Sequence, residues 1–314
     1  MSKSNILFFG ATGAIGSYII AAIVKSREQF GRIAVFTSPS TLENKSAEIN
    51  ALKDNGVEII VGDVNSKEDV VKSFEGIDTI VSSLGRNVIT QQVNLISWAD
   101  SSPQITRFLP SEYGTDIEFS PLSANEKPHQ AKLKVRAALR ATKDLEYAFV
   151  VTGPYIDVPF FLDRKEAETG GTWDVRNRRA VLVGTGEEKI SLVGCEDVGK
   201  FVVATLTNWP SAVGRALKLN SFTTTANEIL SEFEKQTGEK WSVSYIPLNQ
   251  LKDAENEAWA QNLPTATGFT LRRIWAEGGT LYEKRDNGDI GVKDGETITL
   301  QEAVKAAIRA QLTN

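Results

Sequence analysis

The sequence predicts an α/β protein with a doubly wound parallel sheet and a smaller C-terminal α/β region. Short apolar runs alternate with longer amphipathic segments through the first half of the chain, which is the pattern of βαβ units. A glycine-rich turn follows the first apolar run directly, and after Gly153 the regular alternation ends. With 314 residues, of which 41% are hydrophobic, the chain is long enough to bury a substantial core.

Six apolar runs in the first half are expected to form strands. They are residues 5–9, 33–37, 58–62, 79–83, 106–109 and 147–152. Five helices are expected between them, at residues 14–26, 46–55, 67–74, 91–101 and 129–141. Because parallel strands need crossover connections of this kind, the pattern predicts a complete doubly wound sheet over residues 1–153.

Residues 154–314 are expected to form a second, smaller region that binds the substrate. Its predicted elements are a hairpin around 171–186, helices at 197–207, 226–237 and 300–311, strands at 216–219 and 242–246, and a turn-rich stretch at 287–295. The chain has no low-complexity linker, so this region is expected to pack on the first, with some segments returning to the first sheet. A cleft between the two regions is the natural place for a substrate.

The glycine-rich turn predicts a dinucleotide site. Its spacing is Gly-x-x-Gly-x-x-Gly, between a hydrophobic strand and a helix. Glycines allow a sharp turn, a close approach of the backbone to a pyrophosphate, and close packing of the helix on the sheet. The helix N-terminus then presents amide groups to the phosphates. The cofactor-binding residues expected here are Gly10, Thr12, Gly13, Ala14, Ile15 and Gly16, and they make residues 1–153 a Rossmann-like NAD(P)-binding domain.

The end of the second strand favours NADP(H) over NAD(H). An acidic residue there would bind the 2′-hydroxyl of the adenosine ribose, and a basic residue would accept a 2′-phosphate. The sequence runs Ala-Val-Phe-Thr-Ser-Pro-Ser-Thr from Ala34, with no Asp or Glu. We expect Lys45 to supply the positive charge, with hydroxyls from Thr37, Ser38 and Ser40. The alternative is that these residues form a plain polar loop.

Other cofactor contacts are expected where further strands end, because open α/β sheets bind ligands at that edge. Asp63 follows the third strand near the expected adenine position, although a solvated turn aspartate is an equal alternative. The remaining expected contacts are Ser83, Leu84 and Gly85 beside the nicotinamide ribose, and Pro154 and Tyr155 after the sixth strand.

Composition argues against several other classes of protein. The formal charge of −5 and the isoelectric point near 5.3, without a dense Lys/Arg run, argue against a nucleic-acid partner. One cysteine, Cys195, and one histidine cannot make an intrachain disulfide or an ordinary zinc site. No apolar run approaches the roughly 20 residues that span a bilayer. We expect a cytoplasmic monomer or homodimer acting on a small molecule.

The catalytic group is expected on the helix at residues 129–141. The Tyr-x-x-x-Lys pair of ordinary short-chain dehydrogenases is absent, because no tyrosine is followed four residues later by lysine. The helix instead carries His129 and Lys132, which are three residues apart and can share one face. A lysine on an amphipathic helix is usually solvated, and His129 is equally suited to a polar role at the helix start. Lys134 and Arg136 are expected at the surface or in roles unrelated to phosphate.

Several motifs resemble the NmrA-like and isoflavone reductase-like family of atypical short-chain dehydrogenases, which includes plant phenylcoumaran benzylic ether and pinoresinol-lariciresinol reductases. The most diagnostic is the phrase Arg-Phe-Leu-Pro-Ser-Glu-Tyr-Gly at residues 107–114. The others are the glycine turn, Gly62-Asp63, Gln92 before Leu95-Ile96, Lys132-x-x-Val135-Arg136 and Asp197-Val-Gly-Lys. Thr37 departs from the family, whose reductases usually carry arginine there, and beyond Thr207 only general architecture matches.

The resemblance implies an NADPH-dependent reductase in which Lys132 is the general acid or base on a substrate oxygen. It places Glu112 near the nicotinamide, where the carboxylate would orient Lys132 or a substrate hydroxyl, or serve as a buried structural group. Tyr113, Tyr155, Phe160 and Phe161 are expected to line the site of a small aromatic or secondary-metabolite substrate, with simple core packing as the alternative. Two other functions stay open: a dinucleotide-sensing regulator without catalysis, and an enzyme that uses bound NADP(H) in a rearrangement or cyclisation.

Overall fold

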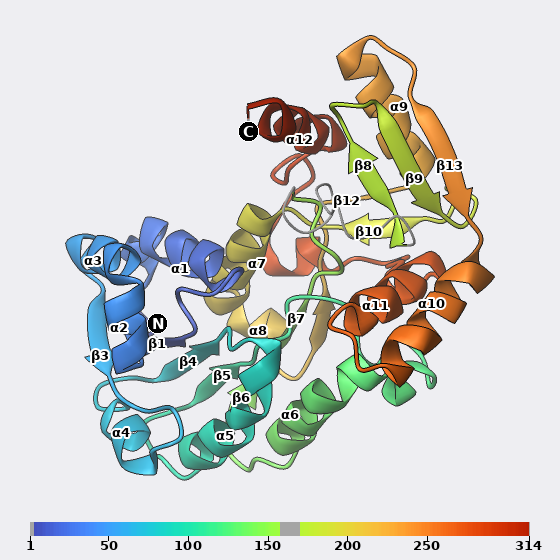
Figure 1. Cartoon of the computed structure of the whole chain (residues 1–314). Helices are drawn as coiled ribbons and strands as arrows, with labels where there is room; N and C mark the ends of the chain where they lie inside the picture. Colours follow the sequence, from blue (N-terminus) through green and yellow to red (C-terminus); the bar gives the residue numbers. More distant parts are fainter. Residues whose placement is uncertain (1–2, 158–169, 314) are drawn as a thin grey trace.

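The computed structural model describes residues 3–157 and 170–313, and its centre is a six-stranded parallel sheet (Figure 1). Phe160 and Phe161 lie outside the described residues. The strand order is β3-β2-β1-β4-β5-β6, so the order reverses between β1 and β4. The strands are β1 (Ile6–Phe9), β2 (Ile33–Thr37), β3 (Glu58–Val61), β4 (Thr79–Ser82), β5 (Arg107–Leu109) and β6 (Glu146–Tyr147). The predicted doubly wound fold is confirmed, and the β1/β4 reversal is where such folds bind ligands.

Helices cover both faces of this sheet because successive strand side chains point to opposite faces. In β1, Ile6 and Phe8 pack into one core with α1 (Gly16–Lys25) and α7 (Cys195–Thr207), whereas Leu7 and Phe9 pack into a second core. The second core includes side chains of α5 (Gln92–Asp100) and α6 (Gln130–Arg140). The remaining helices of this half are α2 (Pro39–Asn44), α3 (Ser46–Asp54) and α4 (Lys67–Lys72).

The single strand predicted at residues 147–152 is wrong, because the structure divides it in two. β6 pairs with β5, but β7 (Phe149–Val151) pairs in parallel with β11 (Ala216–Lys218). The apolar run is continuous in sequence, but the chain changes its partner strand at Ala148. The prediction failed because hydrophobic periodicity does not show which strand a segment pairs with. The C-terminal half packs against the first half at two places. β11 pairs with β7, and α7 packs against α1.

A second, smaller sheet is formed by β8 (Thr172–Asp174), β9 (Arg179–Val183) and β13 (Ser242–Ile246). β8 and β9 form the predicted antiparallel hairpin, and β13 lies parallel to β9. Side chains from α9 (Ala226–Thr237) and α12 (Leu300–Thr313) complete its core. The ends of α9 match the prediction because Thr225 and Glu228 form a capping box at its start and Gly238 ends it with φ of 72°.

The sequence analysis missed two helices that bear on the site, α10 (Leu248–Ala260) and α11 (Ala266–Ala276). They pack on each other, and Figure 1 shows α11 between α6 and the smaller sheet. Most of their buried positions hold small or polar residues, so neither helix shows a clear apolar stripe. The buried residues are Leu251, Glu255 and Ala258 in α10 and Ala266, Thr270 and Ile274 in α11. The other helices and strands that were missed are α2, β10 (Ile190–Leu192), β12 (Phe222–Thr224) and α8 (Trp209–Ala212). In the described parts of the chain, no helix combines the length and the apolar character needed to cross a membrane.

Candidate active site

The glycine turn lies at the reversal point of the sheet, and its tight packing explains two of its three glycines. Gly10 has φ of +84°, and a Cβ there would lie 2.5 Å from the carbonyl oxygen of Ser83. A Cβ on Gly16 would lie 2.0 Å from the carbonyl oxygen of Gly10. A Cβ on Gly13 would lie 3.2 Å from the carbonyl oxygen of Gly10, which is tighter than most Cβ contacts but less severe than the contacts at Gly10 and Gly16. A residue without a side chain here also leaves room for a ligand to approach the backbone.

Two features at this turn suit an anionic ligand. Helix α1 starts at Gly16, and among the described residues no side chain caps it and no acidic residue lies in its first turn. The first amides of a helix have no intrahelical acceptor and carry partial positive charge. The Ser83 hydroxyl is buried beside Gly16 and has no hydrogen-bond partner in the described part of the chain. A diphosphate would therefore find donors here that the protein leaves unused.

Lys45 is the basic residue that the structure brings to this turn. Its Nζ donates to the carbonyl oxygen of Thr12 at 2.5 Å, across from the end of β2. Ser38 caps α2 by accepting from the amide of Thr41 at 3.2 Å, which agrees with the polar-loop alternative for that residue. The Thr37 side chain is buried, and its carbonyl oxygen accepts from the amide of Gly62 at 3.0 Å.

Several groups expected to contact the cofactor at the other strand ends already form hydrogen bonds within the protein. Asp63 is exposed and accepts from the amide and the side chain of Asn65 at 2.9 and 3.0 Å, which is the turn role left open by the sequence. The Leu84 carbonyl accepts from the Ser111 hydroxyl at 3.0 Å, while Gly85 is exposed. The Pro154 carbonyl accepts from the amide of Val193 at 3.1 Å.

Lys132 is buried on the inner face of α6, together with Val135, Arg136 and Leu139. Its Nζ donates to the backbone carbonyl oxygen of Glu112. Burial lowers the pKa of Lys132 to about 8, against the opposing effect of the Glu112 carboxylate and with smaller lowering effects of Arg86 and Arg136. A pKa this close to neutrality lets an amine both release and accept a proton. Lys134, two residues on, is exposed.

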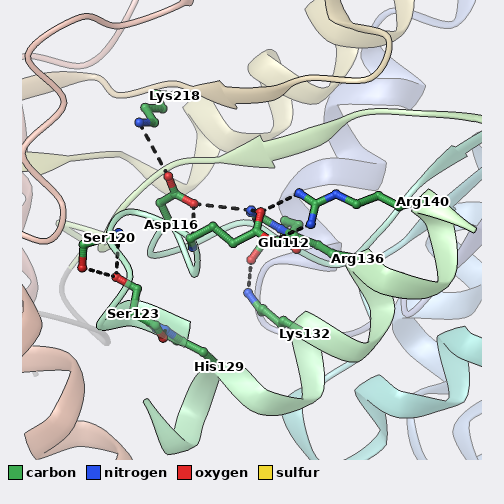
Figure 2. Close-up of polar contacts among 10 residues, drawn as sticks. Glu112, Asp116, Ser120, Ser123, His129, Lys132, Arg136, Arg140 and Lys218 are labelled. Carbon is green, nitrogen blue, oxygen red and sulfur yellow. Dashed lines mark hydrogen bonds and ion pairs between the residues drawn. The ribbon is translucent and has the colours of Figure 1, made fainter. Parts of the chain in front are cut away.

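Glu112 and Arg136 form a buried ion pair that holds the loop after β5 (Figure 2). Arg136 Nε and Nη2 lie 3.0 Å from the two carboxylate oxygens of Glu112, so the contact is bidentate. Arg136 Nη1 also lies 2.7 Å from Glu118. The expectation of a surface role for Arg136 is wrong, because this side chain is fully buried. The Glu112 carboxylate is occupied by Arg136, and it is the Glu112 carbonyl that orients Lys132.

His129 is buried but does not point toward Lys132. Its Nδ1 lies 2.8 Å from the carbonyl oxygen of Ser123, which can only accept, so Nδ1 carries the proton. Figure 2 shows the imidazole directed at Ser123, while Lys132 extends toward Glu112. Burial lowers the pKa of His129. The shared face predicted from the spacing therefore does not bring the two side chains together.

The two tyrosines expected at the site are linked to each other. The Tyr155 hydroxyl donates to the carbonyl oxygen of Tyr113. Tyr113 adopts φ of 29°, which is unusual for a bulky residue and costs roughly 1–3 kcal/mol. Its hydroxyl is buried without a partner among the described residues, and burial raises the pKa of both phenols. Neither phenol is therefore ready to release a proton near neutral pH.

Together, the fold, the open glycine turn and the buried lysine define a dinucleotide-binding class of α/β protein. The chain belongs to the NmrA-like family, whose model matches residues 2–269. This confirms the family predicted from the motifs.

Curated relatives extend the similarity over most of the chain. It is 28% identical over 260 residues to an isoflavone reductase homolog of Arabidopsis thaliana, covering 82% of each chain. It is 26% identical over 274 residues to a phenylcoumaran benzylic ether reductase of Pinus taeda, covering 86% of this chain and 87% of the relative. Among solved structures, the complex of leucoanthocyanidin reductase with NADPH from Vitis vinifera superposes with a TM-score of 0.79 at 21% identity, covering 98% of this chain and 100% of that one. At this low identity, the similarity to leucoanthocyanidin reductase shows a shared fold.

Proposed function

We propose that this protein is an NADP(H)-dependent reductase of a small aromatic substrate, in which Lys132 exchanges the proton on the substrate oxygen. The observation that carries the proposal is the state of Lys132. It is buried, held by one backbone carbonyl, and has a pKa of about 8. Burying an ammonium without a carboxylate that pairs with it directly is costly to stability, which supports a role for Lys132 beyond structure.

The turn at residues 10–16 would hold the diphosphate of the cofactor, and Lys45 would hold its 2′-phosphate. The uncapped start of α1 and the unpartnered Ser83 hydroxyl support the first assignment. The contact of Lys45 with the Thr12 carbonyl supports the second, because it brings a positive charge to the glycine turn in a chain that has Thr37 where reductases of the family usually carry arginine. The solved relative in complex with NADPH supports the choice of nucleotide. When bound, NADPH supplies the hydride.

Lys132 would supply the proton taken up by the substrate oxygen when the attached carbon of a carbonyl or a benzylic ether accepts hydride and its bonding electrons shift to that oxygen. Its ammonium Nζ gives one proton to the substrate oxygen, and the resulting amine recovers a proton from solvent. The Glu112 carbonyl fixes the direction of Nζ, and the Arg136 ion pair fixes Glu112. Residues 154–314 would contribute the substrate-binding side of the site, as expected for this arrangement of the two regions.

The test is to purify the full chain, identify any nucleotide that it carries, and follow NADPH oxidation with a panel of phenolic and benzylic ether substrates. Lys132→Met is compared with Lys134→Met, which removes an exposed lysine from the same helix. We expect the first variant to lose about a hundredfold or more in kcat while NADPH still binds, because general acid or base catalysis contributes that much. The second should act as wild type.

Three results would redirect the proposal. Equal turnover by Lys132→Met and wild type would remove the proton role of Lys132. Nucleotide binding with no change in any small molecule, together with a protein partner that responds to the nucleotide, would favour the regulator. Conversion of substrate without net NADPH consumption would favour the rearrangement or cyclisation.

A further inference from the structure

A hollow on the same side of the molecule as Lys132 lies between the turn η2 (Arg86–Gln91) and helix α11. Its volume is about 380 Å³, and its walls are Arg86, Leu271, Arg272 and Trp275, with Pro264, Thr267 and Gly268 completing it. Two observations place this hollow near Lys132: a hydrogen bond from Trp275 and the electrostatic effect of Arg86. Trp275 Nε1 donates to the Thr115 hydroxyl at 3.3 Å, in the loop that begins with Glu112. The positive charge of Arg86 also acts on both Lys132 and His129.

Arg86 differs from the other arginines that surround the site. Arg136, Arg140 and Arg273 each form ion pairs with carboxylates. Arg86 is exposed and donates only a long hydrogen bond of 3.4 Å to the Pro128 carbonyl, and it has no carboxylate partner in the described parts of the chain. Among the described residues, no acidic side chain lines this hollow. In a chain with net charge −5, the hollow is therefore a local site for a negative group.

The same hollow has an apolar wall. Leu271 and Trp275 lie on α11 four residues apart, so they share one face of the helix and both are half-buried. Trp275 and Arg272 also line a smaller, mainly apolar cavity of about 70 Å³ against the β8–β9 hairpin. A ligand in the larger hollow, the one lined by Arg86, thus meets a guanidinium at one end and an aromatic, apolar surface beside it.

We propose that this hollow binds the carboxylate of an aromatic acid, with Arg86 as its ionic contact and Trp275 as the surface on which its ring packs. The proposal deepens the function above and rests on it, because it places the acid beside the lysine that handles the proton. A guanidinium suits a carboxylate because its planar fork donates two parallel hydrogen bonds. The substrate class is then aromatic carboxylates, rather than neutral phenols.

The test measures binding to the full chain saturated with NADP⁺. The probes are benzoate, p-hydroxycinnamate and naphthoate, each paired with its methyl ester, and the method is titration calorimetry. The ester keeps the ring but removes the charge. We expect at least one acid to bind roughly tenfold to a hundredfold more tightly than its ester, which is the usual contribution of a hydrogen bond to a charged group.

Arg86→Gln should abolish that preference by weakening the acid and leaving the ester nearly unchanged, and Arg86→Lys should retain part of it. Arg27→Gln, which changes an exposed arginine that bonds only to the Asn55 carbonyl, is the control and should keep the preference. The proposal is overturned if no acid binds, if esters bind as well as acids, or if Arg86→Gln weakens NADP⁺ rather than the acids. NADP⁺ affinity and NADPH oxidation are measured separately, so failure of the reductase function is distinct from failure of acid recognition.

Discussion

Replacing Lys132 by methionine tests whether the buried ammonium limits stability as well as serving catalysis. The pKa of Lys132 falls from 10.5 to about 8 on folding, mainly through burial. Each unit corresponds to about 1.4 kcal/mol, so the folded chain binds this proton less tightly by about 3 kcal/mol. Below pH 8 that cost is fully present, since both the folded and the unfolded chain carry the proton. Between about pH 8 and 10.5 only the unfolded chain does, so the free energy of unfolding rises with pH.

The variant removes this dependence on pH. Across pH 7 to 9.5, wild type should gain about 2 kcal/mol in unfolding free energy from Lys132, a gain that Lys132→Met lacks. At pH 7 the variant should be as stable as wild type or up to about 2 kcal/mol more stable, since leaving the Glu112 carbonyl without its donor costs about 1–3 kcal/mol. Lys134→Met is the control, because that side chain is exposed.

Urea unfolding of wild type and both variants at pH 7 and pH 9.5 measures these differences. The reasoning is refuted if Lys132→Met and wild type change by the same amount between the two pH values. Activity gives a second reading of the same group. Because reduction needs the ammonium form, kcat/KM of wild type should fall as pH rises through about 8, the pKa of Lys132 in the free protein.

Three further substitutions test the site. Gly16→Ala should destabilise the chain by a few kcal/mol and abolish NADPH binding, whereas Gly288→Ala, with no atom within 4 Å of its Cβ, should do neither; thermal unfolding and calorimetry compare them. Arg136→Met should lower the unfolding free energy by about 3–5 kcal/mol because Glu112 stays buried and charged, and adding Glu112→Gln should restore part of it; full stability of the single variant would contradict the ion pair. Lys45→Ala should weaken NADPH about tenfold while sparing NADH, and equal losses for both would deny contact with the 2′-phosphate.

The centre of the main sheet could be predicted because β1, β2 and β4 are fully buried and read as continuous apolar runs. β2 and β13 begin and end where predicted, and the helix at Ala226–Thr237 did so because its caps are encoded in adjacent residues. The glycine turn was equally accessible, since local backbone geometry demands glycine at Gly10 and Gly16. By contrast, the buried positions of α10 and α11 hold mostly small or polar residues, and their packing on each other gives no strong periodic pattern.

The candidate site was predicted less completely because it depends on contacts between distant segments. Lys132 was identified by resemblance, but its burial and its lowered pKa follow from the loop after β5 folding over α6. Arg136 was assigned to the surface because charged residues on an amphipathic helix usually face water, whereas three acidic groups draw it inward. Arg86 gave no signal in the sequence, and α11, which completes its hollow, was not predicted.

The sequence by itself determined the family, the doubly wound sheet and the turn that opens α1, because these depend on periodicity and on residues close together in the chain. The tertiary structure decided which charges are buried, which carbonyl holds Lys132, and where the C-terminal half meets the first sheet. The physical reason is that desolvation and ion pairing depend on neighbours in space. Such neighbours come from strands and helices that the chain brings together only when it folds.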